Sequence, residues 1–311
     1  MCVKKYIKYT TLIMLIISVL SLHFYKSEKA NGEYIKWMEF NATSTALKDA
    51  VNADISTNTD DYPVSFVDII AYLAVKYGND FKKYSKSDID KFMEHIKNGE
   101  AVEDFCNMKY FDYYKNSYGA VLNGFVDDKK DGTYGLTAYF PVASGFGWSH
   151  YKDFGASRSW GFKRTHLGND VLGSIGTPIV AVESGYVEAL GWNRYGGWRI
   201  GIRSNDKKRY YYYAHLRKDR PYVKNLKQGD KVEAGQVIGY LGMTGYSNKE
   251  NVNNINIPHL HFGMQIIFDE SQKDGNNEIW IDVYELLEFL GGNKAKVIKN
   301  ESTGDYEHYE N

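Results

Sequence analysis

Short apolar segments separated by glycine-containing turns fill the second half of this chain of 311 residues. Turn signals such as Ser184-Gly185, Gly196-Gly197 and Gly229-Asp230 lie between these segments. The candidate strands are 179–183, 186–192, 198–203, 209–215, 237–241 and 259–267. Strands this short and this closely spaced predict an antiparallel, all-β domain.

The first part of the chain has a different pattern. Apolar residues recur at helical spacing from about residue 63 to 78 and again from 87 to 99, and an aromatic-rich segment follows from 110 to 122. A charged break at 127–132 precedes the strands. We therefore expect an α+β protein with a small helical module, residues 30–131, before the β domain, residues 132–290.

Beyond the strands, a short helix is expected from 282 to 290. Residues 291–311 are polar and carry no apolar stripe. We expect them to form a mobile tail.

The N-terminus predicts a membrane anchor within residues 1–29. Lys4, Lys5 and Lys8 precede an apolar stretch at residues 10–25, which orients the N-terminus toward the cytoplasm. No small-x-small cleavage site follows, so an uncleaved anchor is favoured over a removed signal peptide. This predicts a single-pass protein of the cell membrane with its folded domains outside the cytoplasm, or a secreted protein if the segment is cleaved.

Charge and cysteine content argue against a nucleic-acid partner and against structural or metal-binding cysteines. The formal net charge of -1 leaves no basic surface for nucleic acid, so no nucleic-acid partner is expected. The two cysteines, Cys2 and Cys106, would lie on opposite sides of the predicted anchor and could not pair in one molecule. Neither a disulfide framework nor a cysteine-based metal site is expected.

Histidines cluster in three short motifs. His259 and His261 lie two positions apart on a candidate strand, so both imidazoles project from the same face. His166 is followed four residues later by Asp170, and His215 ends the strand that lies between these two motifs. Four of the eight histidines therefore fall within about one hundred residues.

These residue types suit a hydrolytic zinc site. Such a site takes three His or carboxylate ligands and leaves a fourth position for water. His166, Asp170 and one member of the pair His259 and His261 would supply the three ligands. Calcium is disfavoured because it prefers oxygen ligands, whereas copper and nickel remain possible on ligand type alone.

The segment from about 160 to 267 resembles the LytM/lysostaphin-type (M23) zinc endopeptidases of bacterial cell walls. The resemblance rests on several motifs taken together: His166-x-x-x-Asp170, Gly176-Thr177-Pro178, Ser184-Gly185-Tyr186-Val187, Tyr213-Ala214-His215-Leu216, Gly229-Asp230-Lys231-Val232, Gly235-Gln236-Val237-Ile238-Gly239 and His259-Leu260-His261-Phe262.

The resemblance implies a role for each site residue. His166, Asp170 and His261 would bind one Zn2+ per chain, and His215 and His259 would be the catalytic pair. Which of the two histidines acts as the base stays open. The substrate would be the stem peptide or cross-bridge of peptidoglycan, and the helical module would position the catalytic domain or bind an extracytoplasmic protein partner.

One alternative belongs to another class of function. Some relatives in the family lose metal ligands and act as binding or activating proteins, so the chain could be a non-catalytic, membrane-anchored cell-wall scaffold that retains the metal site. Five retained site residues argue against this alternative.

Several further residues stand near the motifs. Gly263 follows the His259-x-His261 motif where many family members have Glu, and a long polar segment at 243–257 could shape a substrate groove. Tyr210–Tyr213 alternates between faces, so half of these rings should be core and the others could line the groove. His150, Arg158 and Arg164 could approach substrate carboxylates or lie in a solvated loop.

Overall fold

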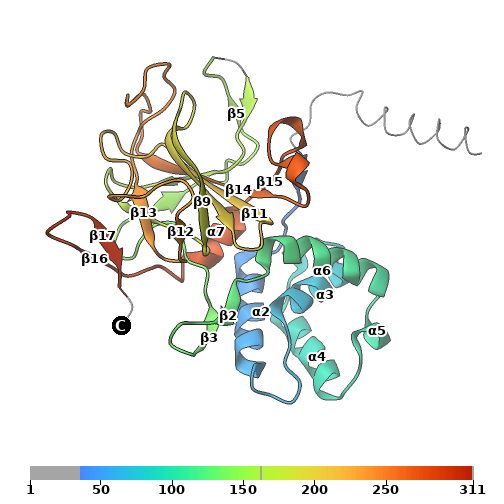
Figure 1. Cartoon of the computed structure of the whole chain (residues 1–311). Coiled ribbons are helices and arrows are strands. Elements are labelled where there is room, and N and C mark those ends of the chain that lie inside the picture. Colours follow the sequence, from blue (N-terminus) through green and yellow to red (C-terminus); the bar gives the residue numbers. More distant parts are fainter. Residues whose placement is uncertain (1–35, 162, 310–311) are drawn as a thin grey trace, which may run out of the picture.

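The computed structural model describes residues 36–161 and 163–309. Helices fill the N-terminal part and strands fill most of the rest (Figure 1). The helices are α2 (Ser44–Thr57), α3 (Phe66–Tyr77), α4 (Lys86–Lys97), α5 (Val102–Phe105) and α6 (Met108–Leu122), and α7 (Tyr284–Leu290) follows the sheet. This order confirms the predicted mixture of a small helical region and an antiparallel β fold.

Helix α3 shows why the helical pattern was visible in the sequence. Ser65 caps its first turn by accepting a hydrogen bond from the N–H of Val67 at 3.3 Å. Gly78 ends the helix in the left-handed conformation, with φ of 62°. Ile69 and Leu73 are fully buried, and α3 packs against α2, α4 and α6.

The main sheet within the described residues has nine strands. Its order is β1 (Lys36–Met38), β15 (Ile279–Ile281), β14 (His259–Ile266), β11 (Arg209–Ala214), β10 (Gly197–Ser204), β9 (Gly185–Asn193) and β12 (Lys231–Val232). Strand β7 (Asn169–Leu172) pairs with the first half of β14, and β4 (Ser149–His150) pairs with β7. All these pairs are antiparallel except β1 with β15.

The described residues also form four two-stranded sheets. They are β2 (Val126–Asp128) with β3 (Tyr134–Leu136), β5 (Ser157–Arg158) with β6 (Arg164–Thr165), β8 (Pro178–Val180) with β13 (Val237–Tyr240), and β16 (Val297–Lys299) with β17 (Tyr306–His308). The β5–β6 hairpin stands at the opposite end of the molecule from the helices (Figure 1).

The two faces of the central strands differ in chemistry. Leu260, Phe262 and Met264 of β14 are fully buried on one face, together with Tyr211 and Tyr213 of β11. The alternate residues of both strands form the opposite face, which carries His259, His261, Tyr210 and Tyr212. The prediction that half of the tyrosine run belongs to the core is correct, and the polar residues gather on the other face.

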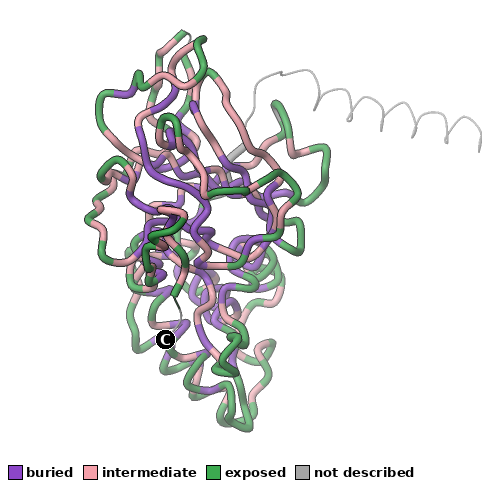
Figure 2. The backbone as a smooth tube through the Cα atoms, turned by 60° about the vertical axis from the view of Figure 1, so that its left-hand side comes forward, coloured by how far each residue is buried: buried purple, intermediate pink, exposed green. Residues whose placement is uncertain are grey.

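The helical region shares a hydrophobic core with the sheet. One continuous cluster of buried side chains extends from the helices into the central strands, and Figure 2 shows buried backbone running through both parts. Polar contacts cross the same boundary: the Arg209 guanidinium donates to the Ala120 carbonyl at 3.2 Å, and the Ser44 N–H donates to Glu285 at 2.9 Å. The domain boundaries drawn from the sequence at 29, 131 and 290 remain predictions.

The C-terminal segment differs from the mobile tail expected for 291–311. Strands β16 and β17 form a hairpin there, and Ala295 is fully buried beside it. Asp305 is also buried, and its carboxylate accepts hydrogen bonds from Arg220 at 2.6 Å, Tyr240 at 2.7 Å and the Lys224 N–H at 3.0 Å. These polar contacts hold the hairpin in place together with Val297 and Tyr306, which pack against a small apolar cluster that includes Ala295.

The expected membrane topology needs correction. No helix in the described ranges is long and apolar enough to cross a bilayer. The apolar stretch at 10–25, on which the expectation rests, lies outside those ranges. Single-pass membrane localisation is therefore not supported.

Candidate metal centre

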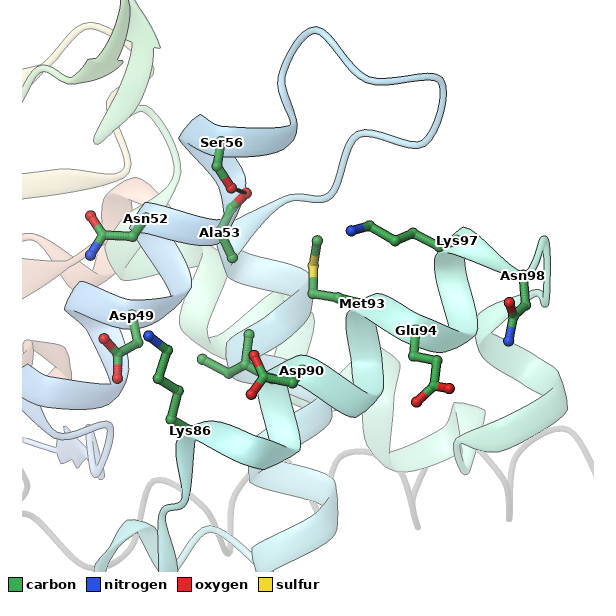
Figure 3. A pocket seen from close by; sticks show the side chains of 11 residues that line it. Asp49, Asn52, Ala53, Ser56, Lys86, Asp90, Met93, Glu94, Lys97 and Asn98 are labelled. Atoms are coloured by element: carbon green, nitrogen blue, oxygen red, sulfur yellow. Dashed lines mark hydrogen bonds between the residues drawn. The ribbon is translucent and has the colours of Figure 1, made fainter.

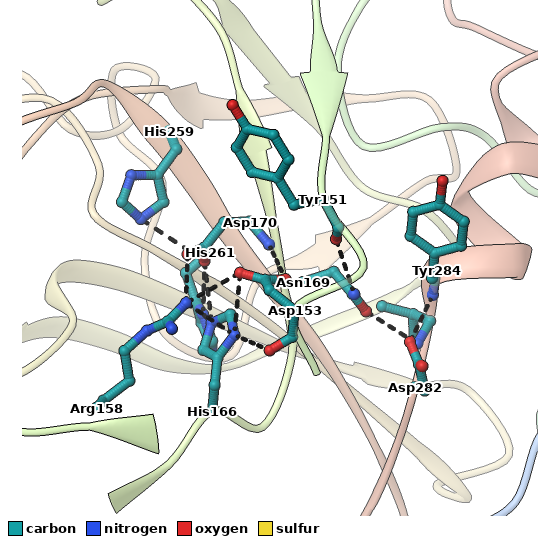
Figure 4. A network of polar contacts seen from close by, with 11 residues as sticks. Tyr151, Asp153, Arg158, His166, Asn169, Asp170, His259, His261, Asp282 and Tyr284 are labelled. Atoms are coloured by element: carbon teal, nitrogen blue, oxygen red, sulfur yellow. Dashed lines mark hydrogen bonds and ion pairs between the residues drawn. The ribbon is translucent and has the colours of Figure 1, made fainter. Parts of the chain in front are cut away.

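His166, Asp170 and His261 meet at one point on the polar face of the sheet (Figure 4). His166 Nε2 lies 2.7 Å from His261 Nδ1 and 3.0 Å from Asp170 Oδ1. His261 Nδ1 lies 3.2 Å from the same carboxylate oxygen. Two distant sequence motifs are thus joined into one cluster of donor atoms.

Strand pairing explains this meeting. His261 of β14 pairs directly with Asp170 of β7, and side chains of paired residues in antiparallel strands lie on the same face. His166 comes from the short link between β6 and β7, where its N–H donates to the Ala156 carbonyl at 2.8 Å. Gly168 lets this link approach β14, because a Cβ at that position would lie 2.6 Å from the Phe262 carbonyl oxygen.

The donor set fits a divalent metal ion. Two imidazole nitrogens and a carboxylate oxygen are ligand types that zinc accepts. Ligand atoms about 2.0–2.1 Å from a tetrahedral zinc ion would be about 3.3 Å apart, so the observed separations of 2.7, 3.0 and 3.2 Å need only a small widening.

Burial and charge act on these ligands in opposite directions. Burial alone would raise the pKa of Asp170, but hydrogen bonds from His166 and His261 outweigh it and hold the pKa well below its usual range. Burial alone would lower the pKa of His166, whereas the carboxylates of Asp153 and Asp170 raise it to about 9. Asp170 is therefore ionised at neutral pH, as a metal ligand must be.

Two further residues hold the ligands in position, and the sequence motifs did not identify either of them as doing so. His166 Nδ1 donates to the Asp153 carbonyl at 3.0 Å, and this bond leaves Nε2 facing the cluster. Arg158 Nη2 lies 2.9 Å from the Asp153 carboxylate and 3.0 Å from Asp170 Oδ2 (Figure 4). Arg158 therefore contacts a protein carboxylate beside the cluster, while Asp153 comes from a loop without any sequence signal.

The other two histidines of the motifs face the same cluster. The rings of His215 and His259 are 4.9 Å apart, and His215 is 5.9 Å from His261. His215 Nδ1 donates to the Thr244 carbonyl at 2.8 Å, and His259 Nδ1 donates to the Ile257 carbonyl at 2.8 Å. Both rings therefore keep Nε2 available for chemistry, and His259 Nε2 lies 3.6 Å from Asp170.

The environment of His215 favours its neutral form. Burial lowers the pKa of His215 well below its ordinary value, and electrostatic repulsion from the nearby imidazoles of His259 and His261 adds to this effect. The backbone of His215 is held in the left-handed region, with φ of 61°, where the strand ends. Its imidazole then presents an unprotonated Nε2 toward the other histidines.

Aromatic side chains from three loops border the cluster. Trp160, from the β5–β6 turn, stacks on Tyr246 with centroids 5.7 Å apart, and it meets the edge of Tyr195 at 5.6 Å. Tyr246 lies 5.6 Å from His215. Tyr246 and Thr244 belong to the long polar segment 243–257, so that segment borders the candidate site as the sequence suggested.

Gly263 occupies a position with no room for a side chain. A Cβ there would lie 2.7 Å from the Trp280 ring and 2.8 Å from the Leu167 carbonyl oxygen. Glycine therefore fits this position, where the resemblance led us to expect Glu, because the Trp280 indole and the Leu167 carbonyl leave no room for a side chain.

Residues 164–275 match the sequence profile of peptidase family M23. The match includes the three ligand residues and both other histidines of the cluster. This segment belongs to peptidase family M23.

Two curated relatives share parts of the chain. An L-Ala–D-Glu endopeptidase of Bacillus subtilis (strain 168) is 32% identical over 211 residues, which cover 66% of this chain and 63% of the relative. Lysostaphin of Staphylococcus staphylolyticus is 44% identical over 98 residues, which cover 31% of this chain and 18% of the relative. The chain thus spans less than two thirds of either relative.

One solved structure is similar in fold to nearly the whole chain. The crystal structure of a LytM protein from Ruminococcus gnavus ATCC 29149 aligns with a TM-score of 0.58, covering 87% of this chain and 95% of that one. The sequence identity of 23% limits this likeness to the fold, which includes the helical region as well as the M23 sheet.

A separate cavity of about 640 Å³ lies in the helical region, between α2 and α4 (Figure 3). Eight of its eleven lining residues are charged or polar, including Asp49, Lys86, Asp90 and Glu94. Both helices belong to the end of the molecule away from β5, so this cavity is not part of the histidine cluster.

Proposed function

We propose that the chain is a zinc-dependent endopeptidase that hydrolyses peptide bonds of bacterial peptidoglycan. The observation that carries the proposal is the convergence of His166, Asp170 and His261 with His215 and His259 on one polar sheet face. The name of the B. subtilis relative, an L-Ala–D-Glu endopeptidase, supports the substrate class.

His166, Asp170 and His261 would hold one zinc ion. When bound, zinc lowers the pKa of a water ligand toward about 7 and polarises a carbonyl group. Asp153 would orient His166 for this purpose, and Arg158 would hold the Asp170 carboxylate through its second oxygen.

His215 and His259 would transfer protons during hydrolysis. His215 would be the general base, because its burial favours the neutral ring and its bond to Thr244 leaves Nε2 as the acceptor. His259 is half-buried and its Nε2 lies near the negative charge of Asp170, so it would donate a proton to the leaving amine or a hydrogen bond to the carbonyl oxygen.

Release of amino groups from peptidoglycan tests this proposal. The full-length chain supplied with zinc should release new amino groups from purified peptidoglycan, and His215→Ala should reduce the rate about 10²- to 10⁴-fold while retaining zinc. His95→Ala is the matched control, since His95 stacks on Phe105 in the helical region. A chain that binds one equivalent of zinc and releases no amine would support the non-catalytic scaffold instead.

A further inference from the structure

Strands β10 and β11 carry three arginines, of which Arg203 and Arg209 form ion pairs. Arg203 pairs with Glu188 at 2.9 Å and with Glu270 at 2.9 Å. Arg209 is likewise paired with two carboxylates, at 2.8 and 3.1 Å. Arg199 forms no ion pair in the described part of the chain, and its buried Nε has no hydrogen-bond partner there. A buried guanidinium N–H without a partner is costly and calls for a reason.

Arg199 lies on the sheet face that carries the histidine cluster. Its neighbour Ile200 is fully buried on the core face, so Arg199 faces the other way. Ile200 pairs with Tyr213, which places Arg199 beside Ala214, and Ala214 pairs in turn with His261. A single strand, β11, therefore separates Arg199 from the strand that carries His261. The β11 residue between them is Ala214, whose side chain is small.

A second guanidinium approaches the same patch from the β5–β6 hairpin. Arg164 lies 4.2 Å from the ring centre of Tyr195 and 5.3 Å from that of Tyr246. Both arginines act on one hydroxyl: burial raises the pKa of Tyr212, and the charges of Arg199 and Arg164 oppose that rise. The Tyr212 ring is 5.7 Å from His261, and Tyr246, which Arg164 contacts, is 5.6 Å from His215, so both guanidinium groups lie near the candidate site.

We propose that Arg199 and Arg164 form a subsite that binds a free carboxylate of the peptide substrate, one or two residues from the scissile bond. The inference rests on the proposed function and specifies its substrate. Both side chains are half-buried, so their positive charge is only partly hydrated and a carboxylate of the substrate can still reach them. A guanidinium presents a planar fork of N–H donors that matches a carboxylate. Substrates built only of glycine would offer no such group within the chain.

The relative in B. subtilis gives this subsite a concrete probe. Its name specifies a bond between L-Ala and D-Glu, and a glutamyl residue carries a second carboxyl group beside that bond. Two synthetic stem peptides should be compared: one containing L-Ala–D-Glu with that carboxylate free, and the same peptide with the carboxylate amidated.

Binding is measured by calorimetry on the full-length, zinc-loaded His215→Ala chain, so that neither peptide is consumed. We expect the free acid to bind at least about 10-fold more tightly than the amide, as a charge-assisted contact requires. Arg199→Gln, introduced into the same His215→Ala chain, should remove this preference. Arg199→Lys should keep part of it, because lysine retains the positive charge but lacks the planar pair of N–H donors. Lys208→Gln, which removes one charge from an exposed turn at the far end of β10, should leave it unchanged.

The two proposals can fail separately in this design. Hydrolysis of either peptide by the chain with His215 intact reports on the proposed function. Equal affinity for acid and amide, or no binding of either, would overturn the subsite. Retention of the preference in Arg199→Gln, with an unchanged thermal unfolding midpoint, would also overturn it.

Discussion

Asp170 is the residue on which the candidate centre most depends. One of its oxygens faces three imidazoles, those of His166, His261 and His259, at 3.0, 3.2 and 3.6 Å. The other accepts from Arg158 at 3.0 Å. This carboxylate supplies the negative charge that several nitrogen atoms share, so its removal should affect metal binding more than folding.

Asp170→Asn should weaken zinc binding by more than about 100-fold, because loss of a group that only orients a ligand already costs about 10- to 100-fold. The amide keeps the size of the side chain but supplies no charge to the ion. Zinc content after dialysis against a graded series of chelators measures the effect. Asp60→Asn, at an exposed position, serves as the control. If Asp170→Asn and the unaltered protein lost zinc at the same chelator concentration, the assignment of Asp170 as a ligand would be wrong.

The residues of the candidate site differ in how well the sequence predicted them. His166, Asp170, His215, His259 and His261 all stand in compact motifs, so pattern and resemblance found them before any coordinates. Asp153 acts partly through its backbone carbonyl, which any residue type could supply. Arg199 was not predicted, because the lack of a hydrogen-bond partner for its buried Nε among the described residues depends on three-dimensional surroundings.

At the scale of single elements, the junction between α3 and α4 depends on a buried carboxylate. Asp88 accepts a hydrogen bond from the Tyr77 hydroxyl at 2.7 Å and pairs with Lys76 at 2.9 Å. These contacts lower the pKa of Asp88 to about 2, and the hydrogen bond from Tyr77 has a larger effect than that from Lys76. The ionised carboxylate therefore ties the end of one helix to the beginning of the next.

Asp88→Asn should lower the free energy of unfolding by about 1 kcal/mol at pH 7. Because the folded pKa of about 2 lies below the unfolded value of about 3.9, the carboxylate stabilises the folded chain above about pH 4. This contribution is lost as the pH falls toward 2, so the two proteins should converge in stability there. Urea denaturation of both proteins at pH 7 and at pH 3 measures the difference. A gap that stays constant with pH would count against the ionised contact.

The C-terminal hairpin depends on a second carboxylate. Asp305→Ala leaves the Arg220 and Tyr240 side chains without their acceptor, so we expect a loss of about 2 kcal/mol and easier proteolysis after residue 295. Denaturation curves and mass spectrometry of the proteolytic fragments measure both effects. Glu301→Ala, whose side chain is 81% exposed, should change neither.

These elements also show where sequence prediction stops. Helix α3 has an apolar stripe with a cap at each end, and its pattern predicted it well. Hairpin β16–β17 has strands of only three residues, and it is held by Asp305 together with Val297 and Tyr306, which pack on a small apolar cluster. None of these residues has a distinguishing sequence context. Local patterns report local energetics, whereas this hairpin is held by partners that are 65 to 85 residues away.

At the scale of the whole molecule, the helical region and the sheet are one unit. Buried apolar side chains run continuously from one to the other, and Arg209, itself buried, hydrogen-bonds to the Ala120 carbonyl of α6. Neither part could expose its share of this core without a large cost in hydrophobic free energy.

We therefore expect the full-length chain to unfold in one cooperative transition. Far-UV circular dichroism reports both the helices and the sheet, while near-UV signals from the tryptophans, several of which lie in the β part, report mainly on that part. The two melting curves should coincide. Two separate peaks in calorimetry, with the helical signal lost first, would show that the regions are independent domains.

Strand β11 begins at Arg209, which contacts the helices, and ends at Ala214, next to the histidine cluster. Its six residues set these two ends about 17 Å apart. The helical region therefore stands clear of the histidine cluster, so a substrate bound at the cluster need not displace the helices.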